Sequence, residues 1–149
     1  MDLKYMDIAF KNAKRAFKLG EVPIGAVIVK NDIILAESFN FKEHDKSVCS
    51  HAELLAIIEA SKKLDNWRLD DCDIYVTLDP CPMCASAIKQ SRIKNVYSAL
   101  ENSYSDNKKI IEKIFSVDST NNSVNYISNL SVDKSKKLLN TFFEMQRNK

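Results

Sequence analysis

The sequence predicts an α/β protein in which helices cover both faces of a central mixed sheet, giving three layers. One observation supports this fold class, and a second supports a single domain. Segments with helical periodicity alternate with short apolar, β-branched segments, and polar turns separate them. No internal repeat or linker divides the 149 residues, a length that can bury a sizeable core in one unit. We therefore expect a single domain over 1–149.

The first expected elements are a helix and a β-hairpin. An amphipathic helix is predicted over 2–19, because apolar residues recur there at three- and four-residue steps and Gly20 suits its C-terminal cap. Strands are predicted over 24–29 and 33–39, since both runs are β-branched and apolar and an Asn-Asp turn joins them. We expect the first of these strands to be buried.

A polar loop is expected over 40–50. It ends in Ser50-x-x-Glu53, which has the form of a capping box and predicts that a second helix starts here. The elements expected after this helix are a strand over 74–78, a third helix from Cys81 to about Ser91, and a strand over 94–100.

The last third of the chain gives a weaker signal. Over 101–125 the sequence is rich in Asn, Ser and Lys, and only 110–115 has the pattern of a short helix. A terminal helix is predicted over 132–145, where apolar residues again recur at helical spacing.

Composition excludes several classes of protein. With 45% hydrophobic and 28% charged residues the chain is typical of globular proteins, not of disordered or collagen-like ones. No apolar run approaches the roughly 20 residues that span a bilayer, and no basic-then-apolar leader opens the chain, so we expect no membrane segment and a cytoplasmic location. The net charge of +2 is small for a protein that grips a phosphate backbone, although basic residues gather near the C-terminus.

Cysteine and histidine spacing indicates a metal site. Cys81 and Cys84 form a Cys-x-x-Cys pair in the first turn of the third predicted helix, and His51 stands at the start of the second. The partly positive N-terminus of a helix lowers the pKa of a thiol toward the thiolate that zinc requires. Three such ligands leave the fourth position of a tetrahedral zinc open for water, and Glu53 is close enough along the helix to move that water's protons.

Each of these residues also has a simpler interpretation. Glu53 could serve only as part of the capping box, and the Cys-x-x-Cys pair could be a redox centre. Cys49 could close the metal shell as a fourth ligand, but we interpret Cys49 and Cys72 as small buried residues. A redox centre would leave the His-x-Glu stretch unexplained, which favours a metal site.

The two motifs together carry a family resemblance. His51-Ala52-Glu53 followed by Pro-Cys81-Pro-Met-Cys84 is the signature of zinc nucleobase deaminases. The chain resembles the bacterial tRNA adenosine deaminases, in the cytidine-deaminase-like group. The resemblance rests on 21–29, Asn40, 51–53, 77–85, 91–93 and 138–147. It fails at 48–50, Val-Cys-Ser in place of a Pro-Thr-Ala type sequence, and at 101–107, which lacks the usual Lys-Thr-Gly-Ala.

The resemblance implies a three-layer α/β/α cytidine-deaminase-like fold with about five strands, one Zn²⁺ per subunit and a homodimer. It implies hydrolytic deamination of adenosine to inosine at the wobble position of a tRNA anticodon, with zinc-activated hydroxide as the nucleophile and Glu53 as the proton shuttle. The zinc ligands would be His51, Cys81 and Cys84. The substrate-binding residues that it implies, facing the base or the anticodon stem-loop, are Asn40, Ala52, Phe142, Phe143 and Arg147.

Two other functions remain open at this stage. A guanine deaminase, or another deaminase of free bases or nucleosides, would share the chemistry, because Cys-Pro-Met-Cys and the altered loop after Leu100 also occur in guanine-deaminase-like relatives. A structural zinc module without catalysis is the alternative from a different class. Phe142 and Phe143 are adjacent and cannot share one helix face, so we expect one to be buried and the other to be free.

Overall fold

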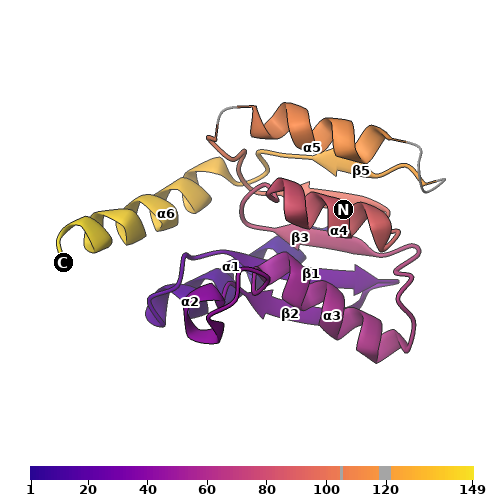
Figure 1. Cartoon of the computed structure of the whole chain (residues 1–149), viewed down its shortest axis with the longest axis horizontal. Helices are drawn as coiled ribbons and strands as arrows, with labels where there is room; N and C mark the ends of the chain where they lie inside the picture. The colour runs from indigo at the N-terminus through magenta and orange to yellow at the C-terminus, as the bar shows by residue number, and fades with distance from the viewer. Residues whose placement is uncertain (105, 118–121) are drawn as a thin grey trace.

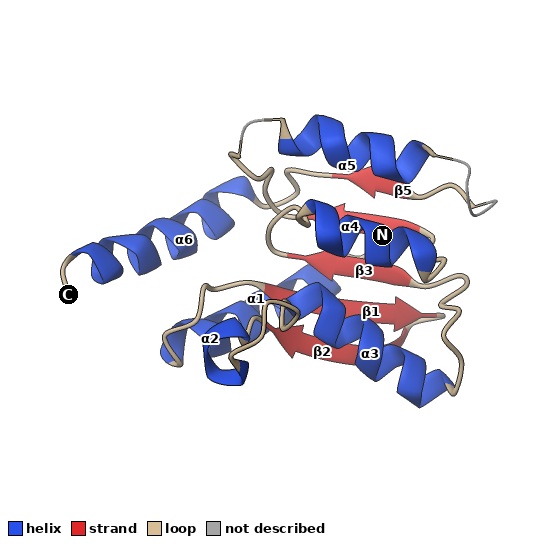
Figure 2. Ribbon diagram, in the orientation of Figure 1, coloured by secondary structure: helices blue, strands red, loops and turns tan. Residues whose placement is uncertain are grey.

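Five strands form one mixed sheet in the computed structural model, which describes residues 1–104, 106–117 and 122–149. Within the described residues the strand order is β2-β1-β3-β4-β5 (Figure 2). β1 runs antiparallel to β2 and β3, whereas β3, β4 and β5 are parallel to one another. The strands are β1 (Gly25–Lys30), β2 (Ile33–Phe39), β3 (Asp73–Val76), β4 (Asn95–Ser98) and β5 (Asn125–Ile127).

Helices cover both faces of this sheet. α3, α4 and α5 pack on one face, and α1 packs on the other, while α6 extends away from the body of the molecule (Figure 1). The predicted three-layer α/β/α fold with about five strands is therefore confirmed. None of the described helices is both long and apolar enough to cross a membrane. The helices are α1 (Leu3–Lys18), α2 (Lys42–Asp45), α3 (Ala52–Leu64), α4 (Pro82–Gln90), α5 (Asn107–Ser116) and α6 (Val132–Arg147).

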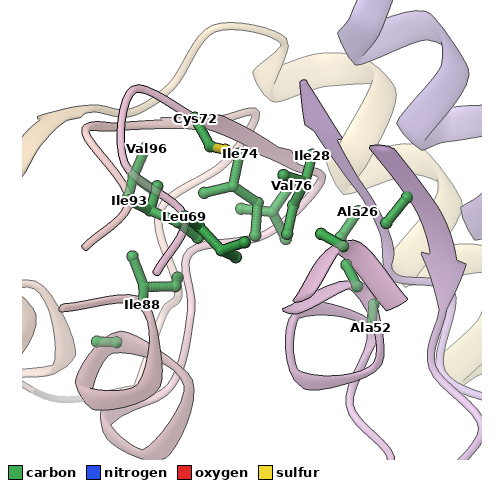
Figure 3. Packing of buried hydrophobic residues seen from close by; sticks show 14 of the residues in the cluster. Ala26, Ile28, Ala52, Leu69, Cys72, Ile74, Val76, Ile88, Ile93 and Val96 are labelled. Atoms are coloured by element: carbon green, nitrogen blue, oxygen red, sulfur yellow. The ribbon is translucent and has the colours of Figure 1, made fainter. Parts of the chain in front are cut away.

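A buried apolar cluster lies on each face of the sheet. Ala26 and Ile28 of β1 face the helices α3 and α4, together with Ile74 and Val76 of β3 (Figure 3). Val27 and Val29, the alternate residues of β1, face α1 instead. Because both faces of β1 are covered, this strand is apolar almost throughout, which is why its sequence lacks a polar alternation.

α1 crosses β1 at unusually short range because residue 25 is a glycine. A Cβ atom at Gly25 would lie 2.0 Å from the carbonyl oxygen of Ala9 and 2.7 Å from the backbone nitrogen of Ala13. No side chain fits in that space. The backbone N–H of Gly25 also donates to the Thr77 hydroxyl at 3.1 Å, which ties the start of β1 to the residue after β3.

Most predicted elements are confirmed to within a few residues. The first helix, both hairpin strands, the third helix, the short helix near 110–115 and the terminal helix all occur. Gly20 has a positive φ of 78° and caps α1 as expected. The weak segment 101–125 includes residues 105 and 118–121, which lie outside the described residues.

Two elements were not predicted, α2 and β5. α2 depends on a distant partner, because the buried carboxylate of Glu21 accepts hydrogen bonds from the backbone N–H groups of Glu43 and His44. β5 is a three-residue edge strand with the sequence Asn-Tyr-Ile, and its residues alternate between exposed and half-buried. Neither element has an apolar periodicity of its own, so the sequence offered no local signal for it.

Two predictions about individual residues are wrong. Ser50 is not the N-cap of α3: His51 occupies that position, and the Ser50 hydroxyl instead donates to Asp45 at 2.6 Å. Cys49, expected to be buried, is exposed because it lies in a surface turn of the loop before His51. Cys72 is buried as expected, and burial raises the pKa of its thiol to about 11.

Candidate active site

His51, Cys81 and Cys84 converge at the N-termini of two neighbouring helices. His51 is the N-cap of α3, Cys81 is the N-cap of α4, and Cys84 lies in the first turn of α4. The Nδ1 atom of His51 is 3.5 Å from the Sγ atom of Cys84 and 3.8 Å from that of Cys81. The three potential ligand atoms lie within 4.8 Å of one another.

The local sequence explains this convergence. Pro82 suits the first turn of α4, because its fixed φ is helical and a helix needs no N–H donor there. The first backbone hydrogen bonds of the two helices run from Ala85 to the Cys81 carbonyl and from Leu55 to the His51 carbonyl. α3 and α4 lie side by side with their N-termini at the same end of the molecule (Figure 1). Their unpaired N–H groups therefore favour negative charge at one shared place.

The two cysteines differ in protonation: Cys84 keeps its thiol proton and donates it in a hydrogen bond to Cys81, which is the thiolate. A hydrogen bond from the Cys84 thiol, with further help from His51, lowers the pKa of Cys81 to about 4, although burial opposes the shift. The hydrogen bond to Cys81 and burial both raise the pKa of Cys84 above its ordinary value. The pKa of His51 is raised, first by its hydrogen bond with Cys81. A divalent cation would take the place of this proton and hold both sulfurs as thiolates.

The donor set and its spacing fit zinc. Tetrahedral zinc with Zn–S and Zn–N bonds of ordinary length separates a sulfur from a ring nitrogen by about 3.6 Å. The separations of 3.5 and 3.8 Å lie close to that value without any movement of the backbone. One imidazole nitrogen and two thiolates are also a donor set that zinc prefers. Among the residues that the structure describes, this is the one group of His, Cys, Asp and Glu side chains identified as able to hold a metal ion.

Glu53 places a buried carboxyl group beside these ligands. It is the second residue of α3 and is 4% exposed. Burial raises the pKa of Glu53 to about 7, and the charge of Cys81 adds to the shift, while the Glu53 backbone N–H and His51 oppose it. A carboxyl group that titrates near neutral pH can both accept and release a proton, which is what a general acid/base requires.

Asn40 and Ala52, which were also predicted to bind the substrate, are both buried. Asn40 follows β2, is 7% exposed, and donates through its side-chain amide to the Val22 carbonyl at 3.4 Å. The loop that it opens is closed by a hydrogen bond from Phe41 to Ser50, directly before His51. Ala52 is buried at the first residue of α3, between His51 and Glu53. Within the described part of the chain, no hydrogen bond joins Asn40 to the ligand group.

The three residues of α6 that were predicted to bind the substrate differ in exposure. Phe142 is 6% exposed and packs edge-on against Phe17 of α1, with ring centroids 5.9 Å apart. Phe143 is 45% exposed, so the expectation that one of the pair is buried and the other free is confirmed. Arg147 is exposed at the end of α6. Figure 1 shows that α6 extends from the side of the molecule where α3 and α4 begin.

The sequence did not point to the residues that surround the Cys81 turn. Asp79 is 2% exposed and accepts hydrogen bonds from the hydroxyls of Tyr126 and Ser128, and Asn107 donates to the Pro80 carbonyl. An acidic residue next to a buried strand was a weak signal, and its partners Tyr126 and Ser128 lie between the weak segment 101–125 and the terminal helix, where no element was predicted.

The fold and the site together define a class of protein. A three-layer α/β/α fold that brings one His, two Cys and a Glu to two helix N-termini is typical of the nucleobase deaminases. The sequence profile of the MafB19-like deaminase family matches residues 1–147, so the chain belongs to this family of enzymes.

Curated relatives show which kind of deaminase within this family the chain resembles. The chain is 38% identical to the tRNA-specific adenosine deaminase of Aquifex aeolicus strain VF5 over 145 residues, covering 97% of this chain and 95% of the relative. It is 50% identical to the tRNA-specific adenosine deaminase of Bacillus subtilis strain 168 over 95 residues, which are 64% of this chain and 59% of the relative. The predicted resemblance to bacterial tRNA adenosine deaminases is confirmed.

Among solved structures, a tRNA deaminase is more similar to this chain than a guanine deaminase is. A structure from a study of A-to-I editing by tRNA:A34 deaminases at the wobble position of transfer RNA superposes with a TM-score of 0.85 at 33% identity, covering 93% of this chain and 100% of that chain. The guanine deaminase of Bacillus subtilis superposes with a TM-score of 0.67 at 30% identity, covering 100% of this chain and 96% of that chain. Guanine deaminases are thus relatives at a greater distance.

Proposed function

We propose that this deaminase converts adenosine to inosine at the wobble position of a tRNA anticodon. The observation that carries the proposal is the near full-length likeness to tRNA-specific adenosine deaminases in both sequence and structure. The chemistry is supported independently by the convergence of three ligand atoms beside the buried Glu53. The chain would act as one catalytic domain.

Zn²⁺ is the proposed cofactor, one per subunit, held by His51, Cys81 and Cys84. When bound, it would supply a water whose pKa is lowered to about 7. Glu53 would then have two tasks: its carboxylate would take a proton from this water and pass it to N1 of adenine, and it would afterwards take the remaining proton of the hydroxyl group added at C6 and pass it to the departing ammonia. The raised pKa of Glu53, about 7, suits both directions of transfer at neutral pH. In this proposal Ala52 and Asn40 line the base pocket.

The proposed macromolecular partner is the tRNA anticodon stem-loop, met in the cytoplasm. Phe143 and Arg147 would contact it, because both are exposed on α6, while Phe142 holds that helix on α1. We also propose a homodimer. Exposed Ile58 on α3 and Met83 on α4 leave apolar area on the helical face that a second copy would cover. Light scattering after gel filtration should then give twice the mass of one chain.

One experiment separates the proposed substrate from its alternatives. The purified protein would be incubated with an anticodon stem-loop that carries adenosine at the wobble position, and separately with guanine, cytosine and their nucleosides. Inosine in nuclease digests of the RNA is the expected result. Ammonia from free bases alone would replace the proposal with a guanine-deaminase-like function, and full zinc occupancy without turnover of any substrate would indicate a structural module.

A further inference from the structure

Asp79 is a buried carboxylate that the proposed chemistry does not use. It lies two residues before Cys81, in the turn between β3 and α4, and it is 2% exposed. Its Oδ1 atom accepts a hydrogen bond from the Ser128 hydroxyl at 2.7 Å, and its Oδ2 atom accepts one from the Tyr126 hydroxyl at 2.5 Å. Both donors lie more than 45 residues further along the chain.

These two bonds give both oxygens of the buried Asp79 carboxyl group a partner in the interior. No Lys, Arg or His side chain forms an ion pair with it in the part of the chain that the structure describes. A buried carboxylate without ion-pair or hydrogen-bond partners is strongly unfavourable. Burial and the bond to Asp79 both raise the pKa of Tyr126, so its phenol stays protonated and remains a donor. The turn can therefore hardly move without breaking bonds that the buried carboxyl group requires.

Further contacts join the same helix to the same part of the chain. The Asn107 side chain, at the start of α5, donates to the Pro80 carbonyl at 3.3 Å. At the other end of α4 the buried Lys89 donates to the Phe115 carbonyl at 2.9 Å. The helix that carries Cys81 and Cys84 is thus held at both ends by residues of α5.

We propose that Asp79 is a positioning residue: anchored by Tyr126 and Ser128, it fixes the turn that presents the Cys81 sulfur to His51 and Cys84. This inference rests on the proposed metal site. Hydrogen-bonding partners that orient metal ligands typically contribute 10- to 100-fold to metal affinity. The edge strand β5, which touches no ligand itself, would then determine how tightly the site holds zinc.

The test is the loss of one hydroxyl, Tyr126→Phe, compared with Tyr97→Phe. Tyr97 lies on the neighbouring strand β4, is buried on the opposite face of the sheet, and forms no hydrogen bond through its hydroxyl within the described residues. Zinc affinity would be measured by competition with a chelator. We expect Tyr126→Phe to bind zinc about 10-fold more weakly than the wild type and Tyr97→Phe to match the wild type.

Two more readouts exclude a merely structural effect. In the cobalt-substituted Tyr126→Phe protein the thiolate-to-metal absorption bands should shift, and in the zinc-free protein the Ala85 amide, bonded to the Cys81 carbonyl, should exchange with deuterium faster. Tyr126→Phe should also have a smaller effect when Asp79→Asn is already present. Equal zinc affinity and equal spectra for Tyr126→Phe and Tyr97→Phe would overturn the positioning role while leaving the metal site intact. A wild-type protein that bound no zinc would overturn both proposals.

Discussion

At the residue scale, Glu53 combines deep burial with a charge-bearing group, a combination that costs stability and is seldom found without a function. Glu53→Gln keeps the shape of the side chain but cannot carry a proton. If Glu53 is the proton shuttle, deamination should fall by at least about 100-fold while zinc content stays unchanged. Single-turnover rates and metal analysis would measure the two quantities.

The matched control for Glu53→Gln is Glu59→Gln. Glu59 lies on the same helix, α3, and is exposed, so the change removes the same charge away from the ligand group. Glu59→Gln should leave the rate near that of the wild type. A Glu53→Gln protein with comparable activity would exclude the proposed role.

Glu21 is a second buried carboxylate, and it organises the loop that leads to His51. Burial alone would raise its pKa, but hydrogen bonds from the Glu43 backbone, and from the His44 side chain and backbone, outweigh burial and lower it. Its folded pKa lies below the unfolded value of about 4.3, so ionised Glu21 stabilises the fold above that pH. This contribution is lost as the pH falls through the folded pKa.

The corresponding change is Glu21→Gln. At pH 7 it should reduce the free energy of unfolding by roughly 1.5–3 kcal/mol, the usual value of hydrogen bonds to a charged group. The difference from the wild type should shrink on acidification below about pH 4.3. Urea titrations at several pH values measure it, with Glu43→Gln as the control because the Glu43 side chain is exposed. A pH-independent difference would show that the charge of Glu21 contributes nothing.

At the element scale, the contact of α1 with β1 depends on the missing side chain of Gly25. The atoms that a Cβ would meet at 2.0 and 2.7 Å belong to the backbone of α1, which cannot turn away as a side chain can. Gly25→Ala should therefore destabilise the protein by about 3 kcal/mol, at the upper end of ordinary overpacking. Gly20→Ala meets no atom within 4 Å and only strains a positive φ, so it should cost about 1 kcal/mol. Thermal unfolding of the two variants compares them, and equal losses would contradict the packing argument.

The elements that could be predicted from the sequence are those whose own residues carry a local pattern. α1 and α6 carry apolar stripes, β1 and β2 carry β-branched runs, and the His51 and Cys81 motifs stand where helices begin, so local patterns locate all of them. The elements that escaped prediction, α2 and β5, are fixed by partners far away in the chain, such as Glu21 for α2. A local pattern cannot record such a partner. For the same reason the convergence of His51, Cys81 and Cys84 was predictable, while the support of the Cys81 turn by Tyr126 and Ser128 was not.

At the scale of the whole molecule, α6 stands apart from the three layers and is held to them at few places. Phe142 packs against α1, the Ser135 hydroxyl donates to the Thr77 carbonyl at 2.6 Å, and Leu138 packs against the cluster beneath α1. The rest of the helix is largely exposed. A helix attached by one face and exposed on the other is suited to contact a large partner, which in the proposed function is the RNA.

The neighbouring phenylalanines allow attachment and recognition to be tested separately. Phe142→Ala should lower the free energy of unfolding by about 3 kcal/mol, because it leaves a cavity against α1. Phe143→Ala should leave stability within about 0.5 kcal/mol of the wild type, since the side chain is exposed. It should nevertheless raise the KM for the anticodon stem-loop about 10-fold, within the range of one lost aromatic–base stack, with kcat little changed. If Phe143→Ala left the KM unaltered, the exposed face of α6 would not be the RNA-binding surface, and contact with the stem-loop would have to come from the loops around His51 and Cys81.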